Sequence, residues 1–486
     1  MPISPQQPDA TLEHVVAARM LIGGEWVAGA RSTDVIDPFR GSLVGTAPVS
    51  GLDDLDAALD AATKAKAMVA ALPGFKRSAI LEKAAQLLAD RIPEIAKIMT
   101  RETGKAIKDS TAEVERSMDT IKLSAGEAVR IEGRHVPLDA APMGAGKIAM
   151  LLRFPVGVVA GITPFNAPFN LACHKVAPAF AAGNAIVLKA PPQAPLTVHA
   201  LSRLFADAGM PAGSLNVLYG GADLGRALVA DLRVDFITFT GSTRAGAEIK
   251  AQSGLRRVAL ELGGNGSTLV HEDADIAAAA AQCARNASRL AGQSCISVQN
   301  IHVHAAVLDR FIADAVATVK TLRLGDPLDS TTDVGTLIDE PAARRVESWI
   351  EDAVAQGARI LVGGKRRGAQ IEPTLLTGVS PGSKVVCEEV FGPVASIIPY
   401  QTIDEAIDRI NASPYGLQCG IFTRSTEIAF RIIREIRAGG IIVNGSSTWR
   451  TDQLPYGGVK ASGIGREGPR YAIEDLTEQR LVVFNL

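Results

Sequence analysis

The stretch "VGVVAGITPFNAPFNLACHKVAPAFAAGNAIVLK", residues 156–189, contains the repeating unit that decides the fold. Its two short runs rich in β-branched residues, 156–162 and 185–189, flank an alanine-rich helical segment. Strand, helix and strand at this spacing predict a βαβ unit. Strand-like runs separated by helical segments continue the pattern at 215–220, 234–241 and 257–264. The segment therefore predicts a doubly wound parallel sheet, and such sheets bind ligands beyond the carboxyl ends of their strands.

A second alternation follows, which predicts a second α/β unit. Its strand-like runs are 299–305, 358–364, 394–400, 417–423 and 439–445, and helices are expected over 273–290, 305–322 and 403–411. The region before residue 150 differs, with a strand pair and a turn at 20–27 and helical spacing over 52–128. Two further strand-like runs, 146–154 and 478–486, belong to neither sheet. Because unpaired strands favour pairing with another chain, we expect a homodimer or a homotetramer.

Composition and charge exclude several classes of protein. The 50 Lys and Arg residues against 52 Asp and Glu give a net charge of -2, which offers no general attraction for nucleic acid or anionic lipid. Every apolar run ends before the ~18 residues that a membrane span needs, and residues 1–20 do not resemble a secretory signal. The five scattered cysteines, with no export signal, favour reduced thiols and a cytoplasmic location.

A metal site is not expected, because no CxxC and no Cys/His pair has zinc-ligand spacing. His302 and His304 would share one face of a strand. We interpret that pair as part of a solvated strand edge, with a metal site as the minor alternative.

Two polar positions follow strands of the first predicted sheet. In "FITFTGSTRAG", Ser242 and Thr243 could cap the next helix and present free N–H groups to a phosphate, or could form an ordinary helix cap. Glu261 in "VALELGGN" ends a strand, where desolvation could raise its pKa into the range of a general base. The alternative is a carboxylate that faces water.

A loop and a strand-end turn contain two more candidates. Cys295 in "GQSC" lies in a loop that substrate could reach, whereas the other cysteines at 173, 283 and 419 fall in helical or strand patterns. An inert buried cysteine is the usual alternative. Asn166 in "PFN" could donate to a developing oxyanion, or could satisfy the backbone of its own turn.

These four motifs, followed by "EEVFGP" at 388–393, resemble the aldehyde dehydrogenase superfamily in order and spacing. The resemblance extends from "IGGEWV" at 22–27 to "YGGVKASGIGREG" at 456–468, which is nearly the whole chain. The stretch "NGSSTWRTDQLPYGGVK" at 444–460 resembles the branch that contains lactaldehyde and phosphonoacetaldehyde dehydrogenase-like enzymes. That branch implies a small polar or anionic aldehyde as substrate. Arg450 could pair with it, or could pack on Trp449 at the surface, and Phe169 is a second candidate substrate contact.

The resemblance implies a thiolate mechanism. Cys295 would attack the aldehyde to give a thiohemiacetal, whose oxyanion the Asn166 amide and the Cys295 backbone N–H would hold. Loss of hydride to a nicotinamide would leave a thioester, which water activated by Glu261 would hydrolyse. The alternatives are a CoA-acylating relative, which commonly lacks the base, a Cys-His hydrolase, and a non-enzymatic, crystallin-like use of the scaffold.

The family also implies NAD or NADP as cofactor. Lys189 would bind the ribose, Ser242 the pyrophosphate, and Glu389 and Phe391 the nicotinamide ribose and ring. The other implied cofactor contacts are Ile162, Thr163, Pro164, Phe165, Gln193, Gly225, Phe239, Thr240, Gly241, Leu262 and Gly263.

Two positions depart from the family pattern. Pro192 stands where many NAD-preferring relatives have a glutamate, so nothing repels a 2′-phosphate and NADP should at least be tolerated. Asn265 stands where "ELGGK" is usual, and we expect it to affect loop packing more than chemistry.

The implied fold is α/β, with two doubly wound parallel-sheet domains and a small β extension for oligomerisation. A Rossmann-like NAD(P)-binding domain would take 19–132 and 151–263, and a catalytic domain 264–470. Oligomerisation strands would take 133–150 and 471–486, after a loose tail over 1–18.

Overall fold

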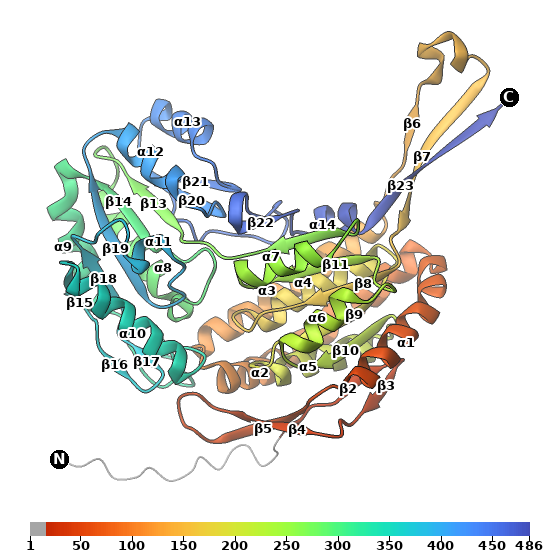
Figure 1. The fold of residues 1–486 in the computed structure, drawn as a ribbon, viewed down its shortest axis with the longest axis horizontal. Helices are drawn as coiled ribbons and strands as arrows, with labels where there is room; N and C mark the ends of the chain where they lie inside the picture. Colours follow the sequence, from red (N-terminus) through yellow and green to blue (C-terminus); the bar gives the residue numbers. More distant parts are fainter. Residues whose placement is uncertain (1–15) are drawn as a thin grey trace.

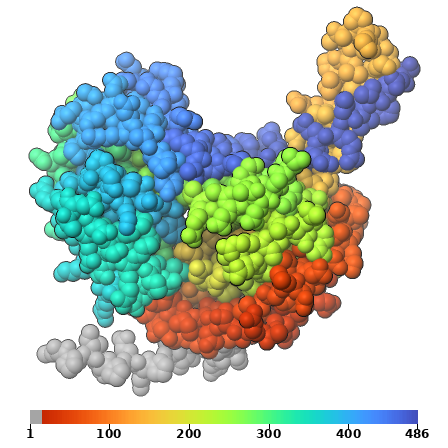
Figure 2. All heavy atoms as spheres, in the orientation of Figure 1, coloured from red at the N-terminus to blue at the C-terminus, as the bar shows by residue number. Residues whose placement is uncertain are grey.

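The structure is a computed structural model that describes residues 16–486. Two α/β lobes lie side by side, and an arm of three strands projects from them, with the C-terminus at its tip (Figure 1). The space-filling view shows the arm standing clear of both lobes (Figure 2). Most of the tail expected over 1–18 lies outside the described residues, and Val16–Ala17 already forms a short strand, β1.

The first lobe contains an eight-stranded sheet in the order β22-β12-β11-β8-β9-β10-β2-β3. Its parallel centre is β12 (Arg257–Glu261), β11 (Phe236–Thr240), β8 (Val158–Ile162), β9 (Ala185–Ala190) and β10 (Leu215–Tyr219). Three antiparallel strands extend its edges: β22 (Gly463–Ile464), β2 (Met20–Ile22) and β3 (Glu25–Val27). The βαβ prediction is confirmed. The near-continuous apolar runs of β8, β9 and β10 arise because helices cover both faces of the sheet.

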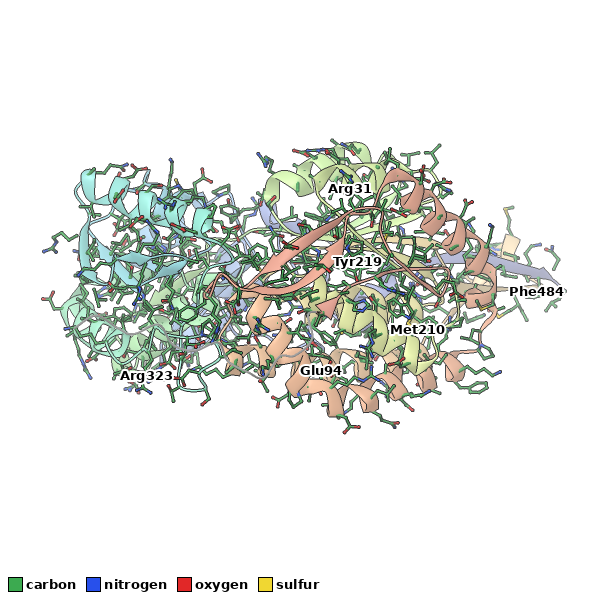
Figure 3. The ribbon with its side chains drawn as sticks, turned by 90° about the horizontal axis from the view of Figure 1, so that it is seen from below. Arg31, Glu94, Met210, Tyr219, Arg323 and Phe484 are labelled. Carbon is green, nitrogen blue, oxygen red and sulfur yellow. The ribbon has the colours of Figure 1, made fainter. Side chains whose placement is uncertain are left out.

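Two groups of helices cover this sheet. The first group is α1 (Leu52–Ala71), α6 (Ala222–Ala230) and α7 (Thr243–Gln252). The second is α4 (Pro168–Ala181) and α5 (Pro195–Ala208), backed by α2 (Gly74–Thr103) and α3 (Ile107–Ala128). Seen from below, the long helices of residues 74–128 line the first lobe, and Glu94 projects from α2 (Figure 3).

Buried carboxylates on α2 and α3 fix the first turns of α5 and α4. Glu113 accepts hydrogen bonds from the backbone N–H groups of Phe169 and Asn170, at 3.0 and 3.2 Å, and pairs with Lys105. Glu102 accepts in the same way from the first turn of α5 at 2.8 and 2.9 Å. Carboxyl oxygens at a helix N-terminus satisfy free N–H groups, although burial raises the pKa of Glu102 to about 8, so its carboxyl group is mostly uncharged at neutral pH. These contacts set the position of α4, whose later residues reach the candidate site.

The second lobe contains a seven-stranded sheet in the order β15-β18-β19-β14-β13-β20-β21. Its strands are β15 (Arg359–Val362), β18 (Thr374–Thr377), β19 (Val394–Tyr400), β14 (Asn300–His304), β13 (Ser267–Val270), β20 (Gln418–Phe422) and β21 (Gly440–Val443). All neighbours are parallel except β15 and β18. The run at 358–364 is therefore an antiparallel edge strand. The sequence did not predict β13 or β18.

Three helices of the second lobe lie near their expected positions: α8 (Ile276–Ser288), α9 (Leu308–Val319) and α12 (Ile403–Ala412). The sequence did not predict the other three, α10 (Glu340–Ala355), α11 (Lys384–Cys387) and α13 (Thr426–Glu435). The prediction that His302 lies on a solvated strand edge is wrong. Because β14 lies between β13 and β19, the His302 side chain is buried, and burial lowers its pKa to about 4.

The arm is a separate three-stranded sheet in the order β23-β7-β6. It consists of β6 (Arg134–Val136), β7 (Lys147–Pro155) and β23 (Thr477–Asn485), and Phe484 lies far out on it (Figure 3). The two orphan strands thus pair with each other in antiparallel register. The boundary expected after residue 150 falls inside β7, and the one after residue 470 falls inside α14 (Pro469–Asp475).

A further three-stranded sheet, which the sequence did not predict, lies near the N-terminus. It contains β1, β5 (Leu43–Pro48) and β4 (Ser32–Ile36). Within residues 16–486, no helix is both long enough and apolar enough to cross a membrane. The same residues contain no group of three or more His, Cys, Asp or Glu side chains placed to hold a metal ion.

Candidate active site

The strand order of the first sheet reverses between β8 and β11, and the site lies at this point. Strands β9 and β10 follow β8 on one side, and β12 follows β11 on the other. The carboxyl ends of β8 and β11 therefore diverge into a crevice. Ser242 begins α7 there, and its hydroxyl accepts a hydrogen bond from the Ala245 N–H at 3.3 Å. The predicted cap is present, with the helix N-terminus available to an anion.

Lys189 lies beside this crevice, one residue before the end of β9. Its side chain is buried, its Nζ donates to the Ala190 carbonyl at 3.1 Å, and burial lowers its pKa to about 8. A Cβ at Gly225 would lie 3.5 Å from the Lys189 Cδ, so a glycine leaves room along the lysine stem. In the described part of the chain no carboxylate forms an ion pair with Lys189. Pro192 and Gln193 are exposed next to it.

The opposite side of the crevice is formed by the loop after α11. Glu389 Oε1 accepts a hydrogen bond from the Gly264 N–H at 3.1 Å, and burial raises its pKa to about 7. The ring of Phe391 meets that of Phe165 edge to face, with centroids 5.9 Å apart. Phe391 has φ 50°, a strained value for an aromatic residue. The strained backbone at Phe391 therefore orients its ring against that of Phe165.

Strained backbone also leads into the Cys295 turn. Leu290, Ala291 and Gly292 have consecutive φ values of 56°, 52° and 71°. A Cβ at Gly292 would lie 1.9 Å from the Gly392 carbonyl oxygen, so only glycine fits there. Strain of this kind persists where surrounding packing over-determines a loop, and it clusters at functional sites.

The Cys295 thiol is partly exposed, and its Sγ lies 3.1 Å from the Tyr456 hydroxyl. Burial raises the thiol pKa to about 12, although the Tyr456 hydrogen bond and Arg450 act to lower it. Glu389 and Glu261 act to raise it. The resting cysteine is therefore a neutral thiol at neutral pH.

Asn166 lies against the same turn. Its Nδ2 donates to the Gln293 carbonyl at 3.0 Å, two residues before Cys295. The structure thus brings Asn166 and Cys295 together, from loops that follow β8 and α8. A second N–H of the amide stays available to another acceptor.

Glu261 ends β12 in a buried position, without a hydrogen bond to Cys295. Burial, then the charge of Glu467, raises its pKa well above the usual range. Its Oε2 finds no hydrogen-bond partner among the described residues. A Cβ at Gly457 would lie 2.7 Å from its Oε1, so the carboxyl group lies beside the Tyr456 segment. The carboxyl group that the sequence suggests as a base is therefore buried, and its pKa is shifted in favour of the neutral form.

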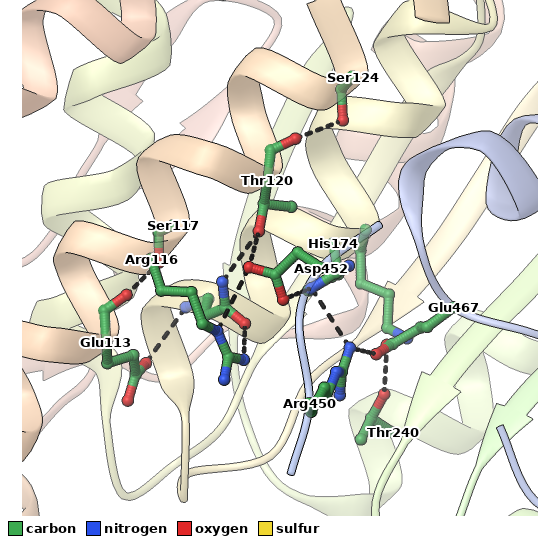
Figure 4. Close-up of polar contacts among 12 residues, drawn as sticks. Glu113, Arg116, Ser117, Thr120, Ser124, His174, Thr240, Arg450, Asp452 and Glu467 are labelled. Atoms are coloured by element: carbon green, nitrogen blue, oxygen red, sulfur yellow. Dashed lines mark hydrogen bonds and ion pairs between the residues drawn. The ribbon is translucent and has the colours of Figure 1, made fainter. Parts of the chain in front are cut away.

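A set of mostly buried ionisable side chains, which we call the ion network, lies behind Glu261. It comprises Arg116, His174, Lys175, Arg450, Asp452 and Glu467, and all of these except Lys175 are labelled in Figure 4. Glu467 binds Lys175 Nζ at 2.7 Å and Arg450 Nη2 at 2.9 Å, and the Thr240 hydroxyl donates to it at 3.3 Å. Burial alone would raise the Glu467 pKa, but these cations outweigh it and hold the pKa well below the usual range.

Asp452 is the second carboxylate of the ion network. Its Oδ1 lies 3.1 Å from His174 Nε2, and its Oδ2 lies 3.3 Å from Arg116 Nε (Figure 4). Burial lowers the pKa of His174, so this histidine is neutral. Although burial acts to raise the Asp452 pKa, its partners hold it well below its usual range. Asp452 is therefore ionised.

A cavity of about 640 Å³ adjoins the Cys295 turn and is lined by Ser294 and Ile296, the neighbours of the cysteine. Three arginines, Arg116, Arg289 and Arg450, also line it, and none of its described lining residues is acidic. Their side chains are exposed by 37%, 53% and 7%, in that order. We call this space the arginine-lined cavity.

Residues 26–482 match the model of the aldehyde dehydrogenase family. The chain belongs to this family. It is 44% identical to a 3-sulfolactaldehyde dehydrogenase from Priestia aryabhattai, over 98% of this chain and 100% of that protein. It is 37% identical to a lactaldehyde dehydrogenase from Methanocaldococcus jannaschii, over 96% and 100% of the two chains.

Solved structures agree with this assignment. An NADP-dependent glyceraldehyde-3-phosphate dehydrogenase from Bacillus halodurans, complexed with NADP, superposes with a TM-score of 0.95 at 35% identity. The alignment covers 97% of this chain and 100% of that one. The family, the α/β fold with its two parallel-sheet lobes, and the lactaldehyde-like branch expected from the motifs are therefore confirmed. So is the assignment as an NAD(P)-dependent aldehyde dehydrogenase.

Several expected site residues also make contacts within this aldehyde dehydrogenase, and the cofactor roles expected for Thr240, Leu262 and Phe239 stay predictions. Phe169 is fully buried in the core beside α3 and does not line the cavity, so it offers no substrate contact in this conformation. The Thr240 hydroxyl donates a hydrogen bond to Glu467. Leu262 and Phe239 pack against Gly246 and Gly241, where a Cβ would come within 2.5 Å of each side chain.

Arg450 lines the cavity, but it is neither an open substrate contact nor a surface residue. Its guanidinium binds Glu467 and lies over the Tyr456 ring, 3.7 Å from the centroid. Trp449, not Arg450, is exposed.

Sequence reasoning missed Tyr456, Lys175, Asp452 and Glu467. Lys175 and Glu467 are 292 residues apart in the chain, so no local pattern marks their contact. Tyr456 lies in "PYGG", at the start of the stretch "YGGVKASGIGREG" that resembles the family. That position is the one sequence signal that could have marked Tyr456 as a site residue.

Proposed function

We propose that this aldehyde dehydrogenase oxidises a small anionic aldehyde to a carboxylic acid with NAD or NADP, through a thioester on Cys295. The single observation that carries the substrate class is the arginine-lined cavity beside Cys295. Arginine presents a planar fork of N–H donors that suits sulfonate, phosphonate, phosphate or carboxylate groups. The relative that acts on 3-sulfolactaldehyde, by its name, makes a sulfonated aldehyde the first to test.

The charge balance supports an anion in this cavity. Three cations, Arg116, Lys175 and Arg450, meet only two ionised carboxylates, Asp452 and Glu467. One positive charge is left over. Because it lies in a partly enclosed, low-dielectric space, it attracts an anionic substrate more strongly than a surface charge does.

The cysteine chemistry follows from the contacts of the turn. The Cys295 sulfur would form a bond to the aldehyde carbon, and the carbonyl oxygen would become an oxyanion. The Asn166 amide and the Cys295 backbone N–H are the donors for this charge. When bound, the nicotinamide supplies a hydride acceptor, and loss of hydride leaves the acyl group on the sulfur.

Glu261 is the base proposed for hydrolysis of this thioester. The neutral carboxyl must first lose its proton to solvent, and Glu261 lines a small cavity together with Lys175 and Glu467. The ionised Glu261 then takes a proton from water that attacks the acyl carbon, and the Cys295 thiolate leaves.

The residues of the crevice fit a nicotinamide dinucleotide. The α7 N-terminus at Ser242 suits a pyrophosphate, and buried Lys189 would hold the adenosine ribose. Glu389, whose Oε2 is not used by Gly264, would accept from the other ribose. The Phe165 and Phe391 rings bound a space that suits a flat ring. With Pro192 in place of a carboxylate, NADP is accepted as well as NAD.

We also propose a homodimer or homotetramer. The edge strand β21 is unpaired on its outer side, and the arm projects from the body as a sheet of its own (Figure 1). Analytical ultracentrifugation tests the assignment, and a monomer at micromolar concentration would contradict it.

The substrate test measures nicotinamide reduction with NAD and NADP separately. Its panel pairs 3-sulfolactaldehyde, succinate semialdehyde and glyceraldehyde 3-phosphate with the uncharged lactaldehyde and benzaldehyde. We expect at least one anionic aldehyde to exceed lactaldehyde in kcat/KM by about tenfold or more, because one charged hydrogen-bonded contact contributes about that factor. If kcat/KM for the uncharged aldehydes equals or exceeds that for every anionic aldehyde, the proposal of an anionic substrate is excluded.

CoA distinguishes the hydrolytic reaction from the acylating one. We expect added CoA to leave the rate and the free acid product unchanged, because Glu261 is present. A CoA thioester as the product would show that the chain is an acylating enzyme. The Cys-His hydrolase is not supported, because the described hydrogen-bond partner of Cys295 is a tyrosine.

A further inference from the structure

Tyr456 lies directly against the nucleophile of the proposed reaction. Its side chain is buried in a small cluster with Ile296 and Leu417, which Cys295 joins. Its backbone exchanges two hydrogen bonds with Glu467, at 3.1 and 2.6 Å, which fix the phenol relative to the ion network. The phenol oxygen lies 3.1 Å from the Cys295 sulfur. Tyr456 is the single side chain among the described residues that hydrogen-bonds this thiol.

Arg450 polarises the same phenol. Its guanidinium carbon lies 3.7 Å from the ring centroid, and Glu467 holds it there at 2.9 Å. A cation on the face of an aromatic ring is attracted to its electrons, and the interaction is stronger when both are desolvated. The positive charge withdraws electron density from the phenol and makes its O–H a better donor.

The other charged groups that face Cys295 do not replace this contact. Glu389, from the loop after α11, and Glu261, from the end of β12, both disfavour a negative sulfur. Arg450 favours it, but its Nη2 lies against Glu467 and His174, and no hydrogen bond joins its guanidinium to Cys295 among the described residues. A thiolate in this turn therefore has one hydrogen-bond donor from a side chain, the phenol of Tyr456.

We propose that Tyr456 is a catalytic residue whose hydroxyl donates a hydrogen bond to the Cys295 thiolate, supported by Arg450 on the face of its ring. With a neutral thiol, either group can donate. With a thiolate, only the phenol can, and the hydrogen bond becomes charge-assisted and stronger. The thiol proton leaves to solvent, and Tyr456 keeps its own. This inference rests on the proposed role of Cys295 as nucleophile.

The contact acts at two stages of the proposed reaction. Before attack it increases the fraction of thiolate. Once sulfur is bonded to the substrate carbon it carries no charge, and the hydrogen bond weakens. When the thioester is hydrolysed, sulfur leaves as a thiolate and the strong hydrogen bond forms again. Tyr456 therefore favours both the formation of the nucleophile and its release.

Alkylation of Cys295 by iodoacetamide tests the inference without any aldehyde. The rate constant at Cys295 is measured by peptide mass spectrometry from about pH 6 to about pH 10, in the wild type and in Tyr456→Phe, which removes only the hydroxyl. We expect alkylation to be about threefold to tenfold slower at every pH, with the rising limb displaced to higher pH. This range combines the loss of one charge-assisted hydrogen bond with the greater nucleophilicity of a more basic thiolate.

Two controls separate this role from a structural one. Cys387, the other partly exposed cysteine, serves as an internal control in each sample. Its alkylation rate should be the same in the wild type and in Tyr456→Phe. Tyr400→Phe removes a buried phenol hydroxyl from the second lobe and should leave Cys295 unchanged. A loosened turn would expose the thiol and speed its alkylation. Equal or faster reaction of Cys295 in Tyr456→Phe would thus overturn the proposal.

The same samples keep this result distinct from the proposed function. If alkylated wild-type protein still reduces NAD or NADP in the presence of aldehyde, Cys295 is not the nucleophile and the proposed function fails. If alkylation abolishes reduction but Tyr456→Phe alkylates at the wild-type rate, only the role of Tyr456 fails.

Discussion

The ion network and the arginine-lined cavity share Arg116 and Arg450, yet the two regions use positive charge differently. In the network, the buried Lys175 and Arg450 and the partly exposed Arg116 are bound to carboxylates at 2.7–3.3 Å. Arg289, which also lines the cavity, has a partner, Asp109, but its side chain is 53% exposed, and within residues 16–486 its Nη groups donate to no protein acceptor. From this comparison we propose that charges paired inside the protein set proton affinities, whereas the partly open ones select the substrate.

The largest expected effect is on stability, and it separates Arg450 from Arg289. Arg450→Met leaves the buried Glu467 without one of its cations and should cost about 3–5 kcal/mol of unfolding free energy. Arg289→Met changes an exposed side chain and should stay within about 0.5 kcal/mol of the wild type. Urea unfolding followed by fluorescence measures both. Similar losses in the two variants would show that the buried and open arginines do not differ as described.

Arg289→Met, which should barely change stability, should have a large effect on substrate selection. Arg289→Met should reduce kcat/KM for the best anionic aldehyde by about tenfold to a hundredfold, mainly through KM, because a charged contact to the substrate is lost. Turnover of uncharged lactaldehyde should be unchanged. Steady-state kinetics with both substrates measure the ratio. An equal loss for both aldehydes would mean that Arg289 does not recognise the anion.

The ion network should instead control the pH dependence. The negative charge of Glu467 helps to raise the pKa of Glu261, so Glu467→Gln should lower that pKa. The ionised base would then be present at lower pH. The acid limb of kcat should therefore move down by about one pH unit, a change worth about 1.4 kcal/mol.

Glu474→Gln is the matched control, because it removes the same charge from an exposed position on α14. Its kcat profile should coincide with that of the wild type. An acid limb that stays in place, or moves up, in Glu467→Gln would show that Glu467 does not act on the base.

The sequence predicted the parts of the fold that repeat locally. The apolar runs of β8 to β12 and the helices between them are visible because both faces of the sheet are covered. Strands such as β13, "STLV", and β18, "TLLT", are short and partly polar, and their burial comes from neighbours far away in the chain. Motifs likewise predicted Cys295, Glu261 and Asn166 as candidates.

The surroundings of these candidates could not be predicted in the same way. Thr120 and Asp452 meet across 332 residues, and His174 and Asp452 across 278. A lysine or aspartate at such a position looks like any other in its own helix or loop. Arg450 was visible as a candidate, but its pairing with Glu467, which decides its role, depends on the tertiary structure.

The smallest expected effect concerns the far end of the crevice, where Lys189 is a buried cation without a carboxylate partner in the described chain. Pro192→Glu places a carboxylate near it, which should repel a 2′-phosphate and accept from a 2′-hydroxyl. We expect the ratio of kcat/KM for NADP to that for NAD to fall about tenfold or less, because Pro192 is exposed and the new charge is screened. Pro192→Gln, which is uncharged, is the control. A low concentration of salt should enlarge the effect, and an equal change in both variants would show that the charge at residue 192 does not select the cofactor.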